Sequence, residues 1–302
     1  MLRSMYSGIS GMKGFQTKLD TIGNNIANVN TYGFKKGRVT FQDMMSQTMS
    51  AAQGPTALAD GENIRGGLNP SQVGLGSQVG SIDTIHTQGN RQTTNRPLDL
   101  ALEGDGMFVL GEGTAELPIS TDDAALDLQA VNLSFTRAGN FYLDSDGAIV
   151  NGEGKYLIGQ NGEGGGAGAI TIPTDAQSFS IQTDGTVNYI DSTGNTAVAG
   201  QIRLAQFSNP SGLQKIGGNA FQNTNNAGVY SVDGEGLASI DDLIAPGQNG
   251  TGQTVSGALE MSNVDLAESF TEMITAQRGF QANTRIITTS DEILQELVNL
   301  KR

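Results

Sequence analysis

The chain has 302 residues, no cysteine and a formal net charge of −14. The length is sufficient for two modest domains with cores of their own, and the absence of cysteine excludes disulfides and thiolate metal sites. No run of roughly 18 apolar residues occurs, and no apolar leader with a small-residue cleavage site, so we expect neither a membrane-spanning helix nor a cleaved signal peptide.

The charge is unevenly distributed along the chain. Residues 1–40 carry a net charge of +5, residues 259–302 carry −3, and the 218 residues between them carry −16. A basic first segment and an acidic last segment suit each other as neighbours, within one chain or between chains. The acidic middle argues against nucleic acid or an anionic membrane as a partner, although charge that only maintains solubility explains it equally well.

The first thirty residues carry an apolar side chain at every third or fourth position. This is the spacing of a coiled-coil seam, and it predicts one helix from Leu2 to Asn28. Four glycines (Gly8, Gly11, Gly14 and Gly23) each cost about 1 kcal/mol relative to alanine, so the helix needs a partner surface. The C-terminal helix of the same chain is one candidate; we favour packing among many chains. The predicted subunit-interface residues here are Leu2, Met5, Ile9, Met12, Phe15, Leu19, Ile22, Ile26 and Val29.

Residues 31–77 are predicted to form a connector. Turn-forming pairs between residues 54 and 70 indicate a loop. Before them, four large apolar side chains suggest a short helical continuation: Phe41, Met44, Met45 and Met49. Residues 247–261 are expected to form the second part of this connector, on the return to the C-terminus.

Residues 78–246 show short β-like runs separated by turn dipeptides such as Asp146-Gly147 and Asp184-Gly185. This pattern predicts an antiparallel β domain, either a sandwich or an irregular barrel, with a surface excursion at Thr114–Gln129. The expected strands are Val79–Thr87, Leu98–Leu102, Met107–Leu110, Leu133–Thr136, Phe141–Leu143, Ala148–Val150, Tyr156–Ile158, Ala169–Ile172, Phe179–Gln182, Val187–Ile190 and Val198–Phe207.

The last forty residues again carry apolar side chains at heptad spacing. Ser262 and Asp265 stand at capping-box spacing, so we expect a helix from Ser262 or Asn263 to the end of the chain. The fold class is therefore predicted as mixed α and β. Helices at residues 1–30 and 262–302 form a coiled-coil-like domain, and the middle domain is antiparallel and all-β. The predicted interface residues of the last helix are Leu266, Phe270, Met273, Phe280, Ile287, Leu294 and Val298.

The sequence offers no case for an enzyme. His86 is the only histidine, so no histidine-based triad or zinc site can be assembled, and we expect neither a metal nor a cofactor. Asp144-Ser145-Asp146-Gly147 lacks the later ligands of a calcium loop and is better explained as a hairpin turn. The glycine pattern at residues 162–167 lies in a low-complexity loop without a following helix, which argues against nucleotide binding.

Three motifs resemble those of bacterial flagellar rod and hook proteins. They are the stretches 23–35 (GNNIANVNTYGFK), 95–108 (NRPLDLALEGDGMF) and 272–283 (EMITAQRGFQAN). The resemblance covers both ends of the chain and most of the middle, and the three motifs in this order are highly specific. The family-motif residues carried over to this sequence are Asn24, Asn25, Ala27, Asn28, Thr31, Gly33 and Phe34.

Within that family two functions compete. Gly257-Ala258-Leu259-Glu260 and the ending Val298–Arg302 look most like a hook protein, so we expect a hook subunit. The long connector is also a feature of distal rod proteins, and the chain lacks the large outer domain of longer hook proteins. A distal rod subunit is therefore the alternative, and a secreted oligomeric adhesin is a more distant one.

The resemblance implies a structural protein whose copies stack helically into a tube outside the cell, with the terminal helices inside and the β domain outside. It also implies export through the flagellar type III apparatus without a cleaved signal peptide. The implied partners are copies of the chain itself, together with rod, hook-cap and hook–filament junction proteins. Nucleic acid and membrane insertion are not expected.

Overall fold

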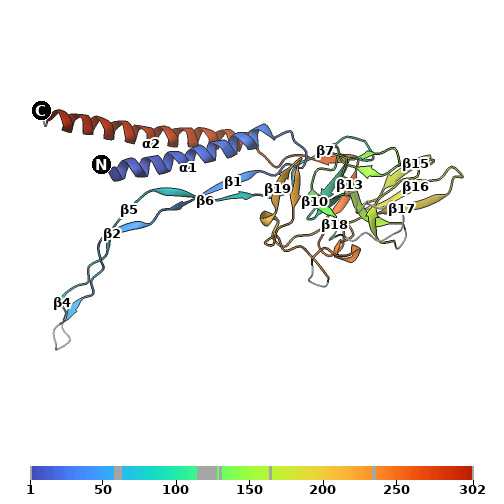
Figure 1. The fold of residues 1–302 in the computed structure, drawn as a ribbon, viewed down its shortest axis with the longest axis horizontal. Helices are drawn as coiled ribbons and strands as arrows, with labels where there is room; N and C mark the ends of the chain where they lie inside the picture. Colours follow the sequence, from blue (N-terminus) through green and yellow to red (C-terminus); the bar gives the residue numbers. More distant parts are fainter. Residues whose placement is uncertain are drawn as a thin grey trace. The chain divides into compact units, whose positions relative to one another are not determined.

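The computed structural model describes residues 2–57, 63–113, 128, 131–162, 165–232 and 236–300. The chain forms two compact units (Figure 1). The first consists of Met1–Ala27, Gly37–Thr84 and Asp265–Arg302, and the second of Asn28–Lys36 and Ile85–Val264. A helix at each end and a mainly antiparallel β middle confirm the predicted fold class. Within the described ranges, no helix is long and apolar enough to cross a membrane.

Two antiparallel helices, α1 (Leu2–Ala27) and α2 (Leu266–Leu300), form the first unit together with a β-hairpin. Glycines allow the helices to approach closely. A Cβ added to Gly11 would lie 2.6 Å from the side-chain nitrogen Nδ2 of Asn283, and one added to Gly279 would lie 2.6 Å from the ring of Phe15. The C-terminal helix of the same chain is thus one surface that covers α1, as the alternative interpretation of the sequence allowed.

The start of α2 differs from the prediction. The Asp265 side chain accepts hydrogen bonds from the backbone N–H groups of Ala267 (2.8 Å) and Glu268 (3.3 Å), so Asp265 caps the helix. The hydroxyl of Ser262 accepts from Val264 N instead, before the helix begins. The capping-box spacing placed the helix start at Ser262 or Asn263, a few residues too early.

Residues 37–57 and 63–84 form the two arms of one long antiparallel hairpin, and the helix expected around Phe41–Met49 is wrong. Three pairs of strands follow one another along it: β1 (Gly37–Asp43) with β6 (Ser77–Thr84), β2 (Ser46–Ser50) with β5 (Ser71–Gly74), and β3 (Thr56–Ala57) with β4 (Asn63–Arg65). The expected strand Val79–Thr87 belongs to this hairpin. The spacing of the apolar residues suggested a helix, but distant partner strands decided the conformation.

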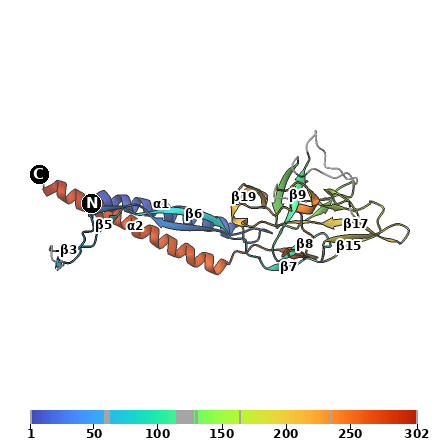
Figure 2. The ribbon, with the colours of Figure 1, turned by 90° about the horizontal axis from the view of Figure 1, so that it is seen from below.

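The part of the hairpin formed by β1 and β6 lies against α1, whereas Figure 1 shows the part with β2 to β5 leaving the helix; Figure 2 gives a second view of α1 and β6. The Asn25 side chain donates to Gly37 O (2.8 Å) and accepts from Gly37 N (2.9 Å), as a neighbouring strand would. The ring of Phe15 lies 5.8 Å from that of Phe41 on β1. The packed part of the first unit therefore consists of the two helices and the β1–β6 part of the hairpin.

The second unit is built on an antiparallel sheet in the order β15-β16-β17-β13-β9-β10-β20-β19. Along β9, Phe108 and Leu110 enter one apolar core, and Met107 and Val109 enter a second. The strands are β7 (Arg91–Thr93), β8 (Leu100–Glu103), β9 (Met107–Glu112), β10 (Asn132–Thr136), β11 (Tyr142–Leu143), β12 (Ile149–Val150), β13 (Tyr156–Asn161), β14 (Ala167–Ala169), β15 (Ser178–Ile181), β16 (Thr186–Ile190), β17 (Thr196–Ile202), β18 (Leu204–Ala205), β19 (Gln214–Gly217), β20 (Ala220–Gln222), β21 (Gln253–Ser256) and β22 (Ala258–Glu260), with 3₁₀ turns at Pro210–Gly212 and Ile240–Asp242.

The predicted connector 247–261 contributes two of these strands. β21 pairs with β8, and β22 pairs with β7. The predicted excursion Thr114–Gln129 lies outside the described residues except for Leu128, which is buried. The sequence analysis divided the chain into a terminal helical domain (1–30 with 262–302), a connector (31–77 with 247–261) and a β domain (78–246). Whether each of these parts folds independently stays a prediction.

The close contact at Gly279 yields a test of the helix pair. We expect Gly279→Val to cost about 1–3 kcal/mol, because the ring of Phe15 that it would strike is itself packed against Phe41. Gly23→Ala, with no atom within 4 Å of the added Cβ, is the matched control and should stabilise α1 by up to about 1 kcal/mol. Helical circular dichroism during urea unfolding of the monomer measures both. Equal behaviour of the two variants would refute the close pairing.

Candidate functional site

The predicted interface residues of α1 do not form one exposed line. Ile22 is buried, Ile9 is exposed, and Met5, Met12, Phe15, Leu19 and Ile26 are half-buried, while the Leu2 side chain lies outside the described residues. Val29 follows α1 and belongs to the second unit. The buried face of α1 carries Gly8, Gly11 and Gly14, which the sequence analysis treated only as a source of instability.

The predicted interface residues of α2 divide into two groups. Met273, Phe280, Ile287 and Leu294 are half-buried, in keeping with a place along the helix pair. The other three, Leu266, Phe270 and Val298, are exposed. Five further exposed apolar residues of α2 were absent from the prediction, because the heptad count followed a single line: Ile274, Ile286, Ile293, Leu297 and Leu300.

Six of the eight large apolar residues that are exposed on the described part of α2 gather into two patches. Leu266, Phe270 and Ile274 recur at every fourth residue and form what we term the first patch. The residues Ile286, Ile293 and Leu297, spaced by seven and four, form the second patch. At roughly 100° per residue, the two patches face directions about 160° apart around the helix. α2 therefore presents apolar surface on two opposite sides, one near each end.

Both helices of the first unit carry charged side chains that have no ion-pair partner among the described residues. Lys13 and Lys18 on α1 and Glu292 and Glu296 on α2 form no ion pair with any residue that the structure describes. The helix pair thus offers unpaired charges of both signs, basic on one helix and acidic on the other.

The hairpin also exposes large apolar side chains. Met45 and Met49 are 85% and 68% exposed, and Ile82 on β6 is also exposed. A two-stranded ribbon is only marginally stable in water when nothing covers its faces. The hairpin is therefore a third surface that a partner would stabilise.

The family-motif residues fold a turn instead of lining these surfaces. Asn24 and Ala27 are exposed, and Asn25 holds Gly37 as described above. After the helix, Thr31 N donates to Asn28 O (3.2 Å), and the Thr31 hydroxyl donates to the Asn28 side chain (3.1 Å).

Gly33 and Phe34 continue this turn. The φ of Gly33 is +67°, and a Cβ there would lie 2.5 Å from the backbone nitrogen of Ala138, so only glycine fits. Lys215 Nζ lies 4.9 Å from the centre of the Phe34 ring.

Lys35, directly after this turn, enters a buried ion cluster that sequence reasoning missed. Its Nζ lies 2.6 Å from Glu260 Oε1 and donates to Thr87 O at 2.8 Å. Arg137 Nη1 lies 3.3 Å from Glu260 Oε2. Burial lowers the pKa of Lys35, and Glu260 opposes that shift. No local signal joins Lys35 to a carboxylate 225 residues away.

The cluster joins three separate stretches of the second unit. Gly33 N donates to Glu260 O (2.9 Å), and Gly89 N donates to Glu260 Oε1 (3.0 Å). A Cβ on Gly89 would lie 1.9 Å from Met261 O, so the backbones of these stretches touch. Glu260 is therefore the point at which residues 28–36, 85–90 and 260–264 are held together.

His86 lies beside this cluster. Burial, together with the charges of Lys35, Lys215 and Arg137, lowers the pKa of His86 from 6.5 to about 4. The sequence analysis placed His86 on a strand, whereas it lies just beyond the end of β6. Among the described residues, no group of three or more histidine, cysteine, aspartate or glutamate side chains could hold a metal ion.

Three family models match the chain. "Flagella basal body rod protein" matches residues 5–35, "Flagellar hook protein FlgE/F/G D1 domain" matches residues 125–189, and "Flagellar basal body rod FlgEFG protein C-terminal" matches residues 255–300.

Individual relatives match over whole chains. "Flagellar basal-body rod protein FlgG" of Bacillus subtilis is 54% identical over 304 residues, covering 100% of both chains. In Borreliella burgdorferi, the rod protein FlgG is 36% identical over 307 residues, and "Flagellar hook protein FlgE" is 33% identical over 458 residues, each again covering 100% of both chains. The hook relative therefore carries long insertions that the rod relatives lack.

The buried cluster leads to a stability prediction. Lys35→Met should destabilise the second unit by about 3–5 kcal/mol, because it leaves Glu260 buried with one cation fewer. Lys155→Met, which removes the surface pair with Glu153, is the control and should cost less than about 1 kcal/mol. Thermal unfolding compares the two variants. A similar small loss in both would mean that the Lys35 pair contributes little.

The shifted histidine leads to a pH prediction. The unfolded chain binds a proton at His86 below about pH 6.5, whereas the folded chain does so only below about pH 4. Stability should therefore fall as the pH drops through this window, by up to about 3 kcal/mol from His86. His86→Gln removes this contribution, so the difference between wild type and variant isolates it. Parallel urea unfolding curves for both proteins across the window would contradict the prediction.

Proposed function

The chain belongs to the family of flagellar basal-body rod and hook proteins, and we propose that it is a subunit of the distal rod of the bacterial flagellum. It is a structural subunit and is related to proteins of that kind from end to end. The finer assignment rests on one observation, the 54% identity to a rod protein over 304 residues.

The comparisons favour the rod over the hook that the sequence motifs suggested. The match to the hook protein of Borreliella burgdorferi is 33% identical and extends over 458 residues, against 302 in this chain. The rod protein of the same organism aligns over 307 residues. The segment Gly257–Glu260, cited in favour of the hook, includes β22 and the buried carboxylate of Glu260, so it serves the fold of the second unit.

The surfaces of the first unit support polymerisation of the chain with itself. The two patches of α2 face different directions near opposite ends of the helix, so the first patch of one copy can meet the second patch of another. Such a heterologous contact generates a helical filament when the rotation between successive copies does not close a ring. Lys13 and Lys18 of one copy and Glu292 and Glu296 of another would add complementary charge.

The remaining assignments follow from the distal rod. We propose a basal-body location outside the inner membrane, with export as an unfolded chain and without a cleaved signal. Other rod proteins and the hook would be its neighbours in the assembled structure, and the type III export apparatus its route. The exposed hairpin residues Met45 and Met49 would be covered by adjacent copies.

The proposal predicts which substitutions block assembly. Phe270→Asp in the first patch and Ile293→Asp in the second should abolish pelletable polymer, because each buries an unpaired carboxylate at every subunit contact. Both residues are exposed in the single chain, so monomer melting should change little. Thr275→Asp, an exposed polar position on α2, is the charge-matched control and should still polymerise.

Electron microscopy of the wild-type polymer separates rod from hook. A distal rod subunit should give straight tubes, whereas curved tubes would support the assignment as a hook subunit instead. Discrete small oligomers would contradict both functions. Normal polymer from Phe270→Asp and Ile293→Asp would show that the patches of α2 are not the contact surfaces.

A further inference from the structure

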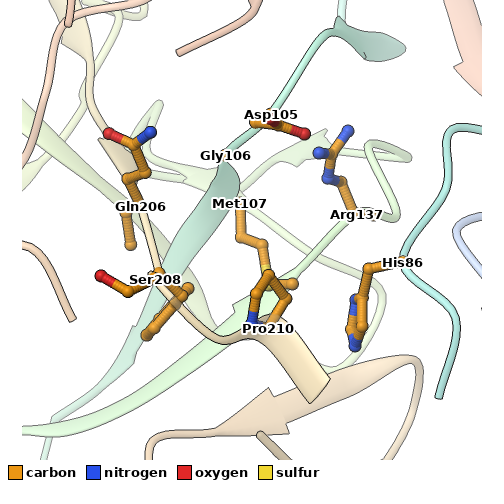
Figure 3. Close-up of a pocket in the computed structure, with 10 residues that line it drawn as sticks. His86, Asp105, Gly106, Met107, Arg137, Gln206, Ser208 and Pro210 are labelled. Atoms are coloured by element: carbon orange, nitrogen blue, oxygen red, sulfur yellow. The ribbon is translucent and has the colours of Figure 1, made fainter. Parts of the chain in front are cut away.

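A cavity of about 220 Å³ lies in the second unit, at the start of β9 (Figure 3). Asp105 and Met107 line it on one segment, and Gln206 and Ser208 line it on another. His86 and Arg137 complete the lining. Figure 3 shows His86 and Arg137 on the opposite side of the view from Gln206 and Ser208. None of the assembly surfaces described above includes this cavity.

Two side chains in this lining carry buried nitrogen atoms without a hydrogen-bond partner among the described residues. Arg137 is 4% exposed, and its Nη1 and Nη2 bond to Glu260 and to Gly104 O, but its Nε has no partner among the described residues. Neither ring nitrogen of His86 has a partner there either, although the ring packs 5.2 Å from that of Phe221. Buried donors without acceptors are rare in native proteins and call for a ligand or water.

The charge around the cavity favours an anion. The cations whose charges act on His86 are Lys35, Lys215 and Arg137; Glu260 pairs with two of them, and Asp105 lines the cavity. Three positive charges face two negative ones, in a chain whose net charge is −14. One additional negative charge would balance the group.

We propose that this cavity binds a single carboxylate group, with Arg137 Nε–H and a ring N–H of His86 as its donors. A carboxylate matches the one-charge excess, whereas a phosphate dianion would exceed it and would face Asp105 with greater repulsion. The group would belong either to a free carboxylic acid or to an Asp or Glu side chain of another copy. Acetate reproduces the end of an aspartate side chain and is the appropriate probe for both.

The lone histidine makes the test direct. Because His86 is the only histidine, its ring proton signals in a proton NMR spectrum of the monomer are unambiguous. Acetate at constant ionic strength should shift these signals saturably. It should also raise the pKa of His86 from about 4, by about one unit, because a bound anion stabilises the imidazolium. Acetamide, which has the same shape without the charge, should do neither, and phosphate should act more weakly than acetate.

Two variants test the donors and the charge balance. Asp105→Asn removes a carboxylate from the exposed rim and should tighten acetate binding about fivefold. Arg137→Gln should abolish the acetate effect. If Arg137→Gln fails to fold, because it also deprives Glu260 of a partner, Asp105→Asn decides. Unchanged or weaker acetate binding in that variant would overturn the proposal, as would an equal response of the wild type to acetate and acetamide.

Measurements on the polymer distinguish the two possible sources of the carboxylate. If a neighbouring copy supplies it, His86 in polymer prepared without acetate should already show the raised pKa by solid-state NMR, and added acetate should have no further effect. If the ligand is free, polymer and monomer should respond to acetate alike. Either result supports a carboxylate site. A polymer in which the pKa of His86 stays near 4 and acetate has no effect would overturn the proposal for the assembled protein.

Discussion

The carboxylate of Glu260 holds residues 28–36, 85–90 and 260–264 of the second unit together. It accepts from Lys35, Arg137 and the backbone of Gly89, while its own backbone carbonyl accepts from Gly33. Removing such charges from water is costly, and the attraction between them offsets that cost only when every donor is satisfied. Thr87 O and Gly104 O, which accept from the two cations, meet part of that demand. The cluster therefore specifies one arrangement of the backbone more than it adds net stability.

This arrangement has a consequence for the order in which the chain folds. Lys35 comes from the first part of the chain, Arg137 from the middle and Glu260 from near the end, so no local segment can form the cluster. Closing such distant contacts costs loop entropy before they contribute stability. The second unit is thus complete only when residues near both ends of the chain are present. For a subunit that is exported unfolded, as we propose here, folding would be delayed until most of the chain has emerged.

The sequence predicted what depends on local spacing. Both terminal helices and most strands were found because residues three or four apart, or two apart, report on one face of one element. The helix expected at Phe41–Met49 was wrong because residues of β1 and β2 pair with partners that lie between 21 (Ser50 with Ser71) and 47 (Gly37 with Thr84) positions further along the chain. The repeated Ser-Gln-Val-Gly at residues 71–74 and 77–80 was the overlooked signal. Lys35 and Glu260 were missed for the same reason, since a pair 225 residues apart leaves no pattern. The exposed patches of α2 could not be separated from its packed line without knowing where α1 lies.

The glycines of α1 connect these findings. Read as helix breakers, Gly8, Gly11 and Gly14 suggested a segment that cannot hold a helix alone. In the structure they are buried, and each lies close to another segment: Gly8 to Ile287, Gly11 to Asn283 and Gly14 to Phe41. These glycines lower the intrinsic stability of the helix, but they let its backbone approach the neighbouring segments closely, which larger side chains would prevent. Ile9 and the two patches of α2 stay exposed in the single chain, and we propose that other copies of the chain cover the patches.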